Sequence, residues 1–292
     1  MAFNPHITIK YDVELVPSGD KNIVDILFVI DNSGSMSAKQ ALLSNLAKDF
    51  IKHIEGIDYQ IAAISTDDID IISPFIISPN ADSVDKLEEL MIHFGVDGSP
   101  EEHVFYNIAQ YLQLEQSTML FRPFSSREII VLTDEKEQSV DDFGEAYSWE
   151  ATLKLFPEST TFNGIVSVTE NCWPESTATN LINIINKTKG ELINICSEDE
   201  SIASDYKKLG EAIAKRSALS LKPVMPVSKV KLGESVDFYS IKVSYGSQII
   251  PRGDLQKGWV FDSFTNEILF GDKIELTTQA RDSQLIIEYK SL

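Results

Sequence analysis

The sequence predicts an α/β protein in which a doubly wound, mostly parallel sheet is followed by a smaller all-β module. From about residue 20 to about residue 218, continuous apolar runs alternate with segments of helical period, which is typical of a parallel sheet covered by helices on both faces. From residue 219 onward, short alternating strands separated by glycine and proline replace this pattern. The 292 residues are enough for one large core and one smaller core. We therefore expect an N-terminal strand segment (1–19), an α/β domain (20–218) and a C-terminal β module (219–292).

The first elements of the α/β domain are a buried strand and an amphipathic helix. The strand is expected in the apolar run VDILFVID at 24–31, and the helix follows at 37–54, where large apolar residues recur at helical spacing. A second strand is expected at 59–66. A third is expected at 69–77, where Pro74 favours an edge position.

The rest of the domain repeats this alternation. After a short helix at 82–93, Ser99 is expected to begin a longer helix, because Ser99 and Glu102 form a capping-box pattern and Pro100 suits the first helical position. The elements expected after it are a buried strand at 127–134, a helix at 141–155, a strand from 162, a helix at 177–187, a strand at 191–196 and a helix at 202–216. In such a fold, ligands bind at the carboxyl ends of the strands.

The C-terminal region is predicted to be all β. A linker with two prolines at 221–227 is followed by short alternating segments, and the N-terminal segment at 6–15 alternates in the same way. If that segment adds a strand to the β module, the α/β domain is an insertion in it. The tripeptide Arg252-Gly253-Asp254 is recognised by some cell-surface receptors, but PRGDL also suits an ordinary turn between strands, and we favour the turn.

The charge of the chain disfavours several classes of partner. The 25 basic and 45 acidic residues give a formal charge of −20, which repels nucleic acids and anionic membrane surfaces, although solubility alone also explains such an excess.

No run approaches the roughly 20 apolar residues that span a bilayer, so membrane insertion is not expected. The first residues lack the features of a signal peptide, which fits a cytosolic protein or a mature region without its leader.

Two cysteines, Cys172 and Cys196, lie at or just beyond the ends of predicted strands. Adjacent strand ends would bring them within bridging distance, and a disulfide would indicate an oxidising compartment. Two buried thiols would be equally ordinary in the cytosol. We favour the disulfide and leave the alternative open.

The pattern most informative about function is D-x-S-x-S directly after the first predicted strand. Its three residues, Asp31, Ser33 and Ser35, carry short oxygen side chains at alternate positions, and such side chains can converge on one hard cation. Gly34 is expected to allow the tight backbone path of the loop. The alternative is structural, with Asp31 capping a helix and the serines serving as ordinary loop residues.

With this motif the chain resembles the von Willebrand factor A (vWA) family, whose metal-ion-dependent adhesion site (MIDAS) begins with D-x-S-x-S after the first strand. Two further parts of the site follow from the resemblance. Asp134, in VLTDE, matches the aspartate after the fourth buried strand, and Ser99 stands at the position of a threonine, with Asp97 as the fallback. The likeness covers about two thirds of the chain and is greatest to bacterial secreted or surface-anchored members.

The resemblance implies a metal-dependent adhesion or protein interaction function. Ser33, Ser35 and Ser99 would bind the cation directly, while Asp31 and Asp134 would act largely through water or hydrogen bonds. Mg²⁺ is the default ion, with Mn²⁺ or Ca²⁺ as substitutes, and the partner is a protein that presents Asp or Glu. The expected location is secreted, periplasmic or at the cell surface, with the cytoplasm as the alternative.

Two other functions are weighed against adhesion: a cytosolic vWA subunit coupled to an ATPase partner, as in chelatase-like relatives, and a metal-dependent hydrolase. The sequence has no nucleophile paired with a base, no phosphate-binding G-x-x-x-x-G-K and no H-E-x-x-H, so we expect that the protein is not an enzyme. The acidic loop formed by Thr66, Asp67, Asp68 and Asp70 is expected to be solvated rather than to border the metal.

Overall fold

The computed structural model describes residues 6–17, 23–67, 76–122, 125–169, 177–217, 221–233, 235–277, 279 and 283–292. The chain divides into two compact units, an α/β unit at Gly19–Ser220 and a β unit made of Met1–Ser18 with Leu221–Leu292. The α/β unit is therefore inserted between the two parts of the β unit.

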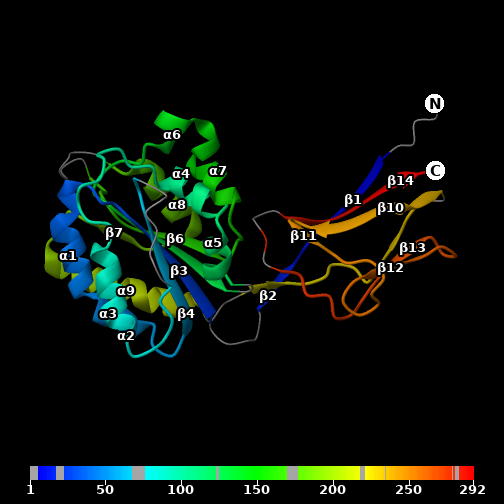
Figure 1. Cartoon of the computed structure of the whole chain (residues 1–292), viewed down its shortest axis with the longest axis horizontal. Helices are drawn as coiled ribbons and strands as arrows, with labels where there is room; N and C mark the ends of the chain where they lie inside the picture. Colours follow the sequence, from blue (N-terminus) through cyan, green and yellow to red (C-terminus); the bar gives the residue numbers. More distant parts are fainter. Residues whose placement is uncertain are drawn as a thin grey trace. The chain divides into compact units, whose positions relative to one another are not determined.

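The α/β unit is built on a five-stranded sheet that is parallel throughout (Figure 1). Its strands, in spatial order, are β4 (Asp58–Ser65), β3 (Ile23–Ile30), β5 (Ser126–Thr133), β6 (Thr160–Val166) and β7 (Leu192–Asn194). β3, the first strand of this unit, thus lies between β4 and β5, and the winding direction reverses there. This is the predicted doubly wound α/β class, in which ligands bind where the strand order reverses.

Helices cover the sheet on both faces (Figure 1). One layer consists of α1 (Ser37–Asn45), α2 (Ala47–His53), α3 (Ser83–Ile92) and α9 (Asp199–Ser217). The opposite layer consists of α4 (Val104–Tyr111), α5 (Glu115–Leu120), α6 (Ser139–Phe143), α7 (Trp149–Lys154) and α8 (Thr179–Thr188). Two 3₁₀ turns, η1 (Gly34–Met36) and η2 (Glu145–Tyr147), complete the described helical segments of this unit.

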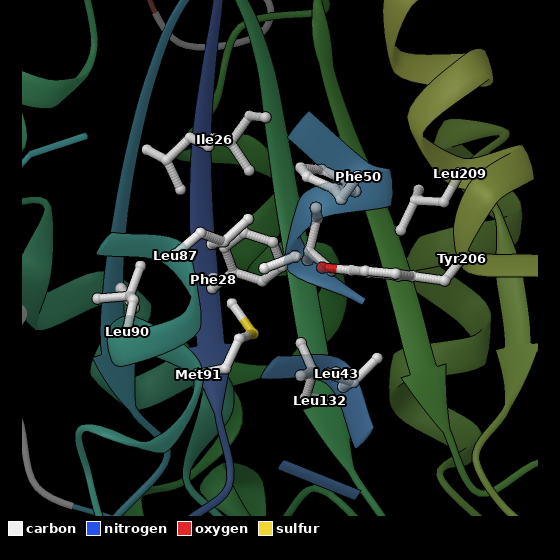
Figure 2. Packing of buried hydrophobic residues seen from close by; sticks show 14 of the residues in the cluster. Ile26, Phe28, Leu43, Phe50, Leu87, Leu90, Met91, Leu132, Tyr206 and Leu209 are labelled. Atoms are coloured by element: carbon white, nitrogen blue, oxygen red, sulfur yellow. The ribbon is translucent and has the colours of Figure 1, made fainter. Parts of the chain in front are cut away.

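Each face of the sheet has its own hydrophobic core, because side chains alternate along β3. Phe28 points into the core under α1, α2, α3 and α9, whereas Leu27 and Val29 point into the other. In the first core Phe50 packs edge-on against Phe28, with ring centroids 5.9 Å apart, and stacks on Tyr206 at 5.0 Å (Figure 2). These contacts fix α2 and α9 on the sheet.

Three predicted helices have different bounds in the structure. The helix expected at 37–54 is interrupted at Leu46, which separates α1 from α2. The helix expected at 141–155 is divided into α6, η2 and α7, because Gly144 adopts a φ of 88° that ends α6. The helix expected from Ser99 begins only at Val104.

The strand predicted at 69–77 lies largely outside the described residues. Ile77, which is described, forms an antiparallel bridge with Ile61 of β4.

The β unit is antiparallel, and its N-terminal strand joins the C-terminal strands as the sequence indicated. One sheet consists of β1 (His6–Asp12), β14 (Gln284–Ser291), β10 (Val236–Tyr245) and β11 (Gln248–Ile249). A second consists of β12 (Trp259–Asp262), β13 (Glu267–Phe270) and β9 (Lys229–Lys231), and β2 (Leu15–Pro17) pairs with β8 (Leu221–Pro223).

The tripeptide at 252–254 forms a turn in this unit. Gly253 has a φ of 87°, and the Asp254 carboxylate accepts hydrogen bonds from the backbone N–H groups of Gln256 and Lys257 at 2.7 and 2.9 Å. The guanidinium of Arg252 lies 3.6 Å from the ring centroid of Phe238.

In the described part of the chain, no helix combines the length and the apolar character needed to cross a membrane.

Candidate metal-binding site

Three adjacent strand ends meet at the carboxyl edge of the parallel sheet. Asp31 follows β3, Thr66 follows β4 and Asp134 follows β5. The backbone continues the sheet beyond these strands, because Asp31 N–H donates to the Leu132 carbonyl at 2.9 Å and Thr66 N–H donates to the Ile30 carbonyl at 3.2 Å. The side chains at this edge therefore have a well-defined scaffold at the point where the strand order reverses.

Four of the five predicted ligands are linked by consecutive hydrogen bonds, one through a backbone N–H and two between side-chain oxygen atoms. The Asp31 carboxylate accepts from Ser33 N–H at 2.7 Å, the hydroxyls of Ser33 and Ser35 lie 3.0 Å apart, and Ser35 Oγ donates to Asp134 Oδ1 at 3.0 Å. The second oxygen of Asp31 accepts from Thr133 Oγ1 at 2.7 Å. Asp31 is fully buried and Asp134 is 7% exposed, while Ser35 is open to solvent.

The loop of the motif is held by polar contacts with neighbouring segments. Gln40 Nε2 donates to the Asp31 carbonyl at 2.8 Å and to the Gly95 carbonyl at 3.0 Å, and Ser65 Oγ donates to the Asn32 side chain at 2.8 Å. Gly98 N–H donates to the Asn32 carbonyl, and a Cβ at Gly98 would lie 2.6 Å from side-chain atoms of Asn32. The close approach therefore requires glycine at 98. Gly34, which was expected to have that role, has no positive φ and has room for a Cβ.

Ser99, the fifth predicted ligand, lies outside this network in the described contacts. Its N–H donates to Asp67 Oδ2 at 3.0 Å, its hydroxyl donates to Glu101, and Glu101 N–H donates back to that hydroxyl at 3.1 Å. The predicted capping box is wrong, because α4 begins four residues later than expected and has His103 at its N-cap without a side-chain cap. Asp97, the fallback, is exposed.

Glu102 is the site residue that sequence reasoning missed. Its side chain is 0% exposed, and neither carboxylate oxygen makes a well-aligned hydrogen bond to the described residues. Its backbone is held by Gln138, whose side chain accepts from Glu102 N–H at 3.0 Å and whose N–H donates to the Glu102 carbonyl at 2.8 Å. His103 N–H donates to the Thr66 carbonyl at 3.0 Å, so the segment also pairs with the end of β4.

No protein-family model matches the chain, and no curated protein matches it. Solved structures do resemble it. A von Willebrand factor type A protein from Catenulispora acidiphila is similar over 99% of this chain and 66% of its own, with 13% identity and a TM-score of 0.47.

Two further solved structures are similar. Proximal thread matrix protein 1 from the mussel byssus, in a form described with a zinc-occupied MIDAS motif, matches 75% of this chain and 49% of its own, with 18% identity and a TM-score of 0.46. The pilus adhesin SpaC from Lactobacillus rhamnosus GG matches 98% of this chain and 42% of its own, with 12% identity and a TM-score of 0.43. The chain thus spans between about two fifths and two thirds of the length of these proteins.

The parallel sheet carries the complete D-x-S-x-S motif at the end of β3 and an aspartate at the end of β5, and the two are hydrogen-bonded through Ser35. The α/β unit resembles a vWA domain. The departure from the expected vWA pattern is confined to the loop before α4, where Glu102, rather than Ser99, is buried beside the motif.

Several carboxyl groups gather at this edge of the sheet, and their surroundings disfavour the ionised form. Burial, followed by the charges of Asp31 and Glu135, raises the pKa of Glu102 to about 9, and the nearby Thr66 hydroxyl opposes this rise. Burial and the charge of Asp31 raise the pKa of Asp134, against the hydrogen bond from Ser35. Burial and the charges of Asp31 and Asp134 raise the pKa of Glu135 to about 7. The charge of Asp31 thus opposes ionisation of Glu102, Asp134 and Glu135, and a bound cation would relieve that repulsion.

The oxygen atoms gathered here fit a hard divalent cation. The site offers hydroxyls and carboxylates and no histidine or cysteine, the combination that Mg²⁺, Mn²⁺ and Ca²⁺ prefer. Among the described residues, no group of three or more His, Cys, Asp or Glu is arranged to hold a metal, so the site depends on its serine hydroxyls.

The prediction that the acidic loop is solvated is wrong for Thr66, which is fully buried with its hydroxyl poorly hydrogen-bonded.

The predicted disulfide involves Cys172, which lies outside the described residues, so the bridge stays a prediction. Cys196 follows β7, and its backbone N–H donates to the Asn194 side chain at 3.2 Å.

Proposed function

We propose that the vWA-like unit binds a divalent cation, with Mg²⁺ as the default, and uses it to hold an acidic side chain of a protein partner. The observation that supports this most directly is the hydrogen-bonded group of Asp31, Ser33, Ser35 and Asp134, with the buried carboxyl group of Glu102 close to Asp31. Burying carboxylates without a compensating cation is unfavourable, and a divalent ion at this position offsets that cost.

The ligand set explains why a carboxylate would complete the coordination. In the proposed site Ser33, Ser35 and Glu102 contact the ion, while Asp31 and Asp134 orient the hydroxyls and bound water. Serine hydroxyls are neutral, so one direct carboxylate leaves the ion with a net positive charge. Because Ser35 is exposed, the remaining coordination position faces solvent, where an Asp or Glu of a partner can replace water.

Two of the structurally similar proteins have properties that agree with this proposal. One has a MIDAS motif occupied by zinc, and the other is a pilus adhesin. We extend an adhesion function to this chain as a proposal, together with a secreted or surface location. The proposed role requires binding and exchange of ligands and includes no catalytic step.

The test is isothermal titration of Mg²⁺ and Mn²⁺ into EDTA-stripped protein. We expect saturable binding that weakens by at least about tenfold in Asp31→Ala and in Glu102→Gln, because each removes charge or orientation from the site. Glu101→Gln is the matched control, since it removes an exposed carboxylate from the adjacent position. An absence of binding by the parent protein, or an equal loss in the Glu101 variant, would contradict the proposal.

A further inference from the structure

A group of four aromatic rings lies next to the candidate metal site. It consists of His103, Tyr106, Phe143 and Tyr147, which we call the aromatic surface. Tyr106 stacks on Phe143 with ring centroids 3.9 Å apart and meets Tyr147 at 5.0 Å, and His103 meets Phe143 edge-on at 4.9 Å. Phe143 is 43% exposed, so the surface presents a large apolar ring to solvent.

The aromatic surface is continuous with the metal site through the backbone. Its rings come from two segments. His103 and Tyr106 belong to the start of α4, which comes just after Glu102, and Phe143 and Tyr147 belong to α6 and η2, which are the next helical segments after Asp134. The two segments are joined by the paired hydrogen bonds of Glu102 with Gln138 and by the bond from Tyr106 N–H to Ser139 Oγ at 3.0 Å. A chain segment whose carboxylate reached the cation would therefore have this surface within reach of its neighbouring residues.

The charge around the aromatic surface is predominantly negative. Asp141, Asp142 and Glu145 are exposed in the same segment, and Glu101 is exposed beside Glu102. Asp142 binds His103 Nε2 at 2.7 Å and Asp141 lies 3.4 Å from Lys136, and the whole chain carries a formal charge of −20. Such a surface repels a purely acidic ligand, whereas the faces of its rings and its carboxylates both attract a cationic side chain.

We propose that the partner segment is basic apart from the acidic residue that reaches the cation, and that a Lys or Arg close to this residue packs over Phe143. The inference rests on the proposed function, because the carboxylate is placed by the metal. The exposed ring supplies a cation–π contact, and Asp141 and Glu145 supply charge complementarity.

The experiment selects peptides on the whole 292-residue chain in Mg²⁺, from a library with a fixed central Asp and random flanking residues. A matched library has Asn at the centre, and both selections are repeated in EDTA. We expect Mg²⁺-dependent recovery from the Asp library alone, with Lys and Arg enriched in the flanking positions. Selected peptides should bind Phe143→Ala about two- to fivefold more weakly than the parent protein, the range of an exposed cation–π contact.

Two further variants identify the contact. Phe143→Leu keeps an apolar side chain but removes the ring, so it should weaken binding as much as Phe143→Ala does. Phe264→Ala removes a ring that is 97% exposed in the β unit, and it should bind like the parent protein.

The outcomes separate the two proposals. Equal recovery from both libraries, or recovery that persists in EDTA, would contradict the proposed function and this inference with it. Mg²⁺-dependent selection of Asp without enrichment of Lys and Arg would overturn the inference alone. Unchanged binding by Phe143→Leu would overturn it as well, because plain apolar packing would then explain the role of Phe143.

Discussion

Glu101 and Glu102 are adjacent in the sequence and have opposite environments. Glu101 is exposed and contacts Ser99, whereas Glu102 is completely buried beside Asp31. The difference arises from the backbone, because Gln138 and Thr66 pair with residues 102 and 103 and direct the second carboxylate inward. The electrostatic properties of the site therefore depend on the segment at residues 102 and 103. Its backbone is held by Thr66, which follows β4, and by Gln138, in the loop after β5.

The first prediction at this scale concerns the pH dependence of stability without metal. Because the folded-state pKa of Glu102 is raised from 4.5 to about 9, its contribution to stability is fully present below pH 4.5 and is lost as the pH rises toward 9. For one proton, the loss is at most about 1.4 kcal/mol per pH unit. In thermal unfolding between pH 5.5 and pH 8.5, Glu102→Gln should show a shallower decline than the parent protein.

Saturating Mg²⁺ should reduce the same decline in the parent protein, because the ion stabilises the ionised carboxylate. Identical pH profiles for the parent and Glu102→Gln would show that Glu102 has no raised pKa.

The second prediction concerns the contact between Gly98 and Asn32. Gly98→Ala would place a methyl group 2.6 Å from the Asn32 side chain, so either that side chain leaves its hydrogen bond with Ser65 or the loop before α4 shifts. We expect a loss of roughly 1–3 kcal/mol in urea unfolding, as for overpacking, together with weaker Mg²⁺ binding. Gly34→Ala is the control, since its Cβ would have an ordinary 3.7 Å contact with the Val96 carbonyl. Equal stability of the two variants would contradict this account.

At the scale of elements, α9 is anchored by a buried ion pair as well as by its apolar face. Arg216, in its last turn, donates to both oxygens of Glu128 at 2.9 Å, and Glu128 is fully buried at the third position of β5. Burial raises the pKa of Glu128 and the hydrogen bonds from Arg216 oppose that rise. The pair ties the end of the last helix to the strand that leads to Asp134.

Removing Arg216 should therefore destabilise the α/β unit strongly. Arg216→Met leaves the Glu128 carboxylate buried without its partner, and we expect a loss of about 3–5 kcal/mol in urea unfolding. Lys208→Met, which removes an exposed ion pair with Asp205 on the same helix, should cause no measurable change. A comparable effect of both substitutions would show that the Glu128 pair has no special role.

At the scale of the whole molecule, the chain forms two units whose hydrophobic cores share no residue. The two cores of the α/β unit lie within residues 24–214, and the third core draws on the N-terminal strand and on residues from 225 onward. The β unit depends on both ends of the chain, because β1 pairs with β14 along seven residues. The described strands and helices of the α/β unit all lie between residues 23 and 217.

We expect the fragment 19–220 to fold on its own and to bind Mg²⁺ with the affinity of the full chain. Circular dichroism and isothermal titration would measure both properties. Deletion of residues 1–18 from the full chain should instead destabilise the β unit, because it exposes one edge of β14. A fragment that folds but binds Mg²⁺ much more weakly would show that the β unit contributes to the site.

The sequence by itself determined the α/β class and the place of the D-x-S-x-S motif at the end of a buried strand, allowed the N-terminal strand to join the β unit, and through the vWA resemblance pointed to Asp134 beside the motif. These features follow from local patterns: apolar runs define buried strands, and neighbouring parallel strands deliver the residues after them to the same edge. The breaks at Leu46 and Gly144 interrupt helices whose apolar pattern continues, so periodicity alone did not locate them.

Only the tertiary structure decided which residue of the loop before α4 is buried beside Asp31. Ser99, Glu101 and Glu102 are all polar and close in sequence, and local capping preferences favoured Ser99. The burial of Glu102 results from pairing with residues 66 and 138, which belong to other loops. Its raised pKa comes from desolvation and from charges that are distant in sequence, and neither cause can be read from local propensity.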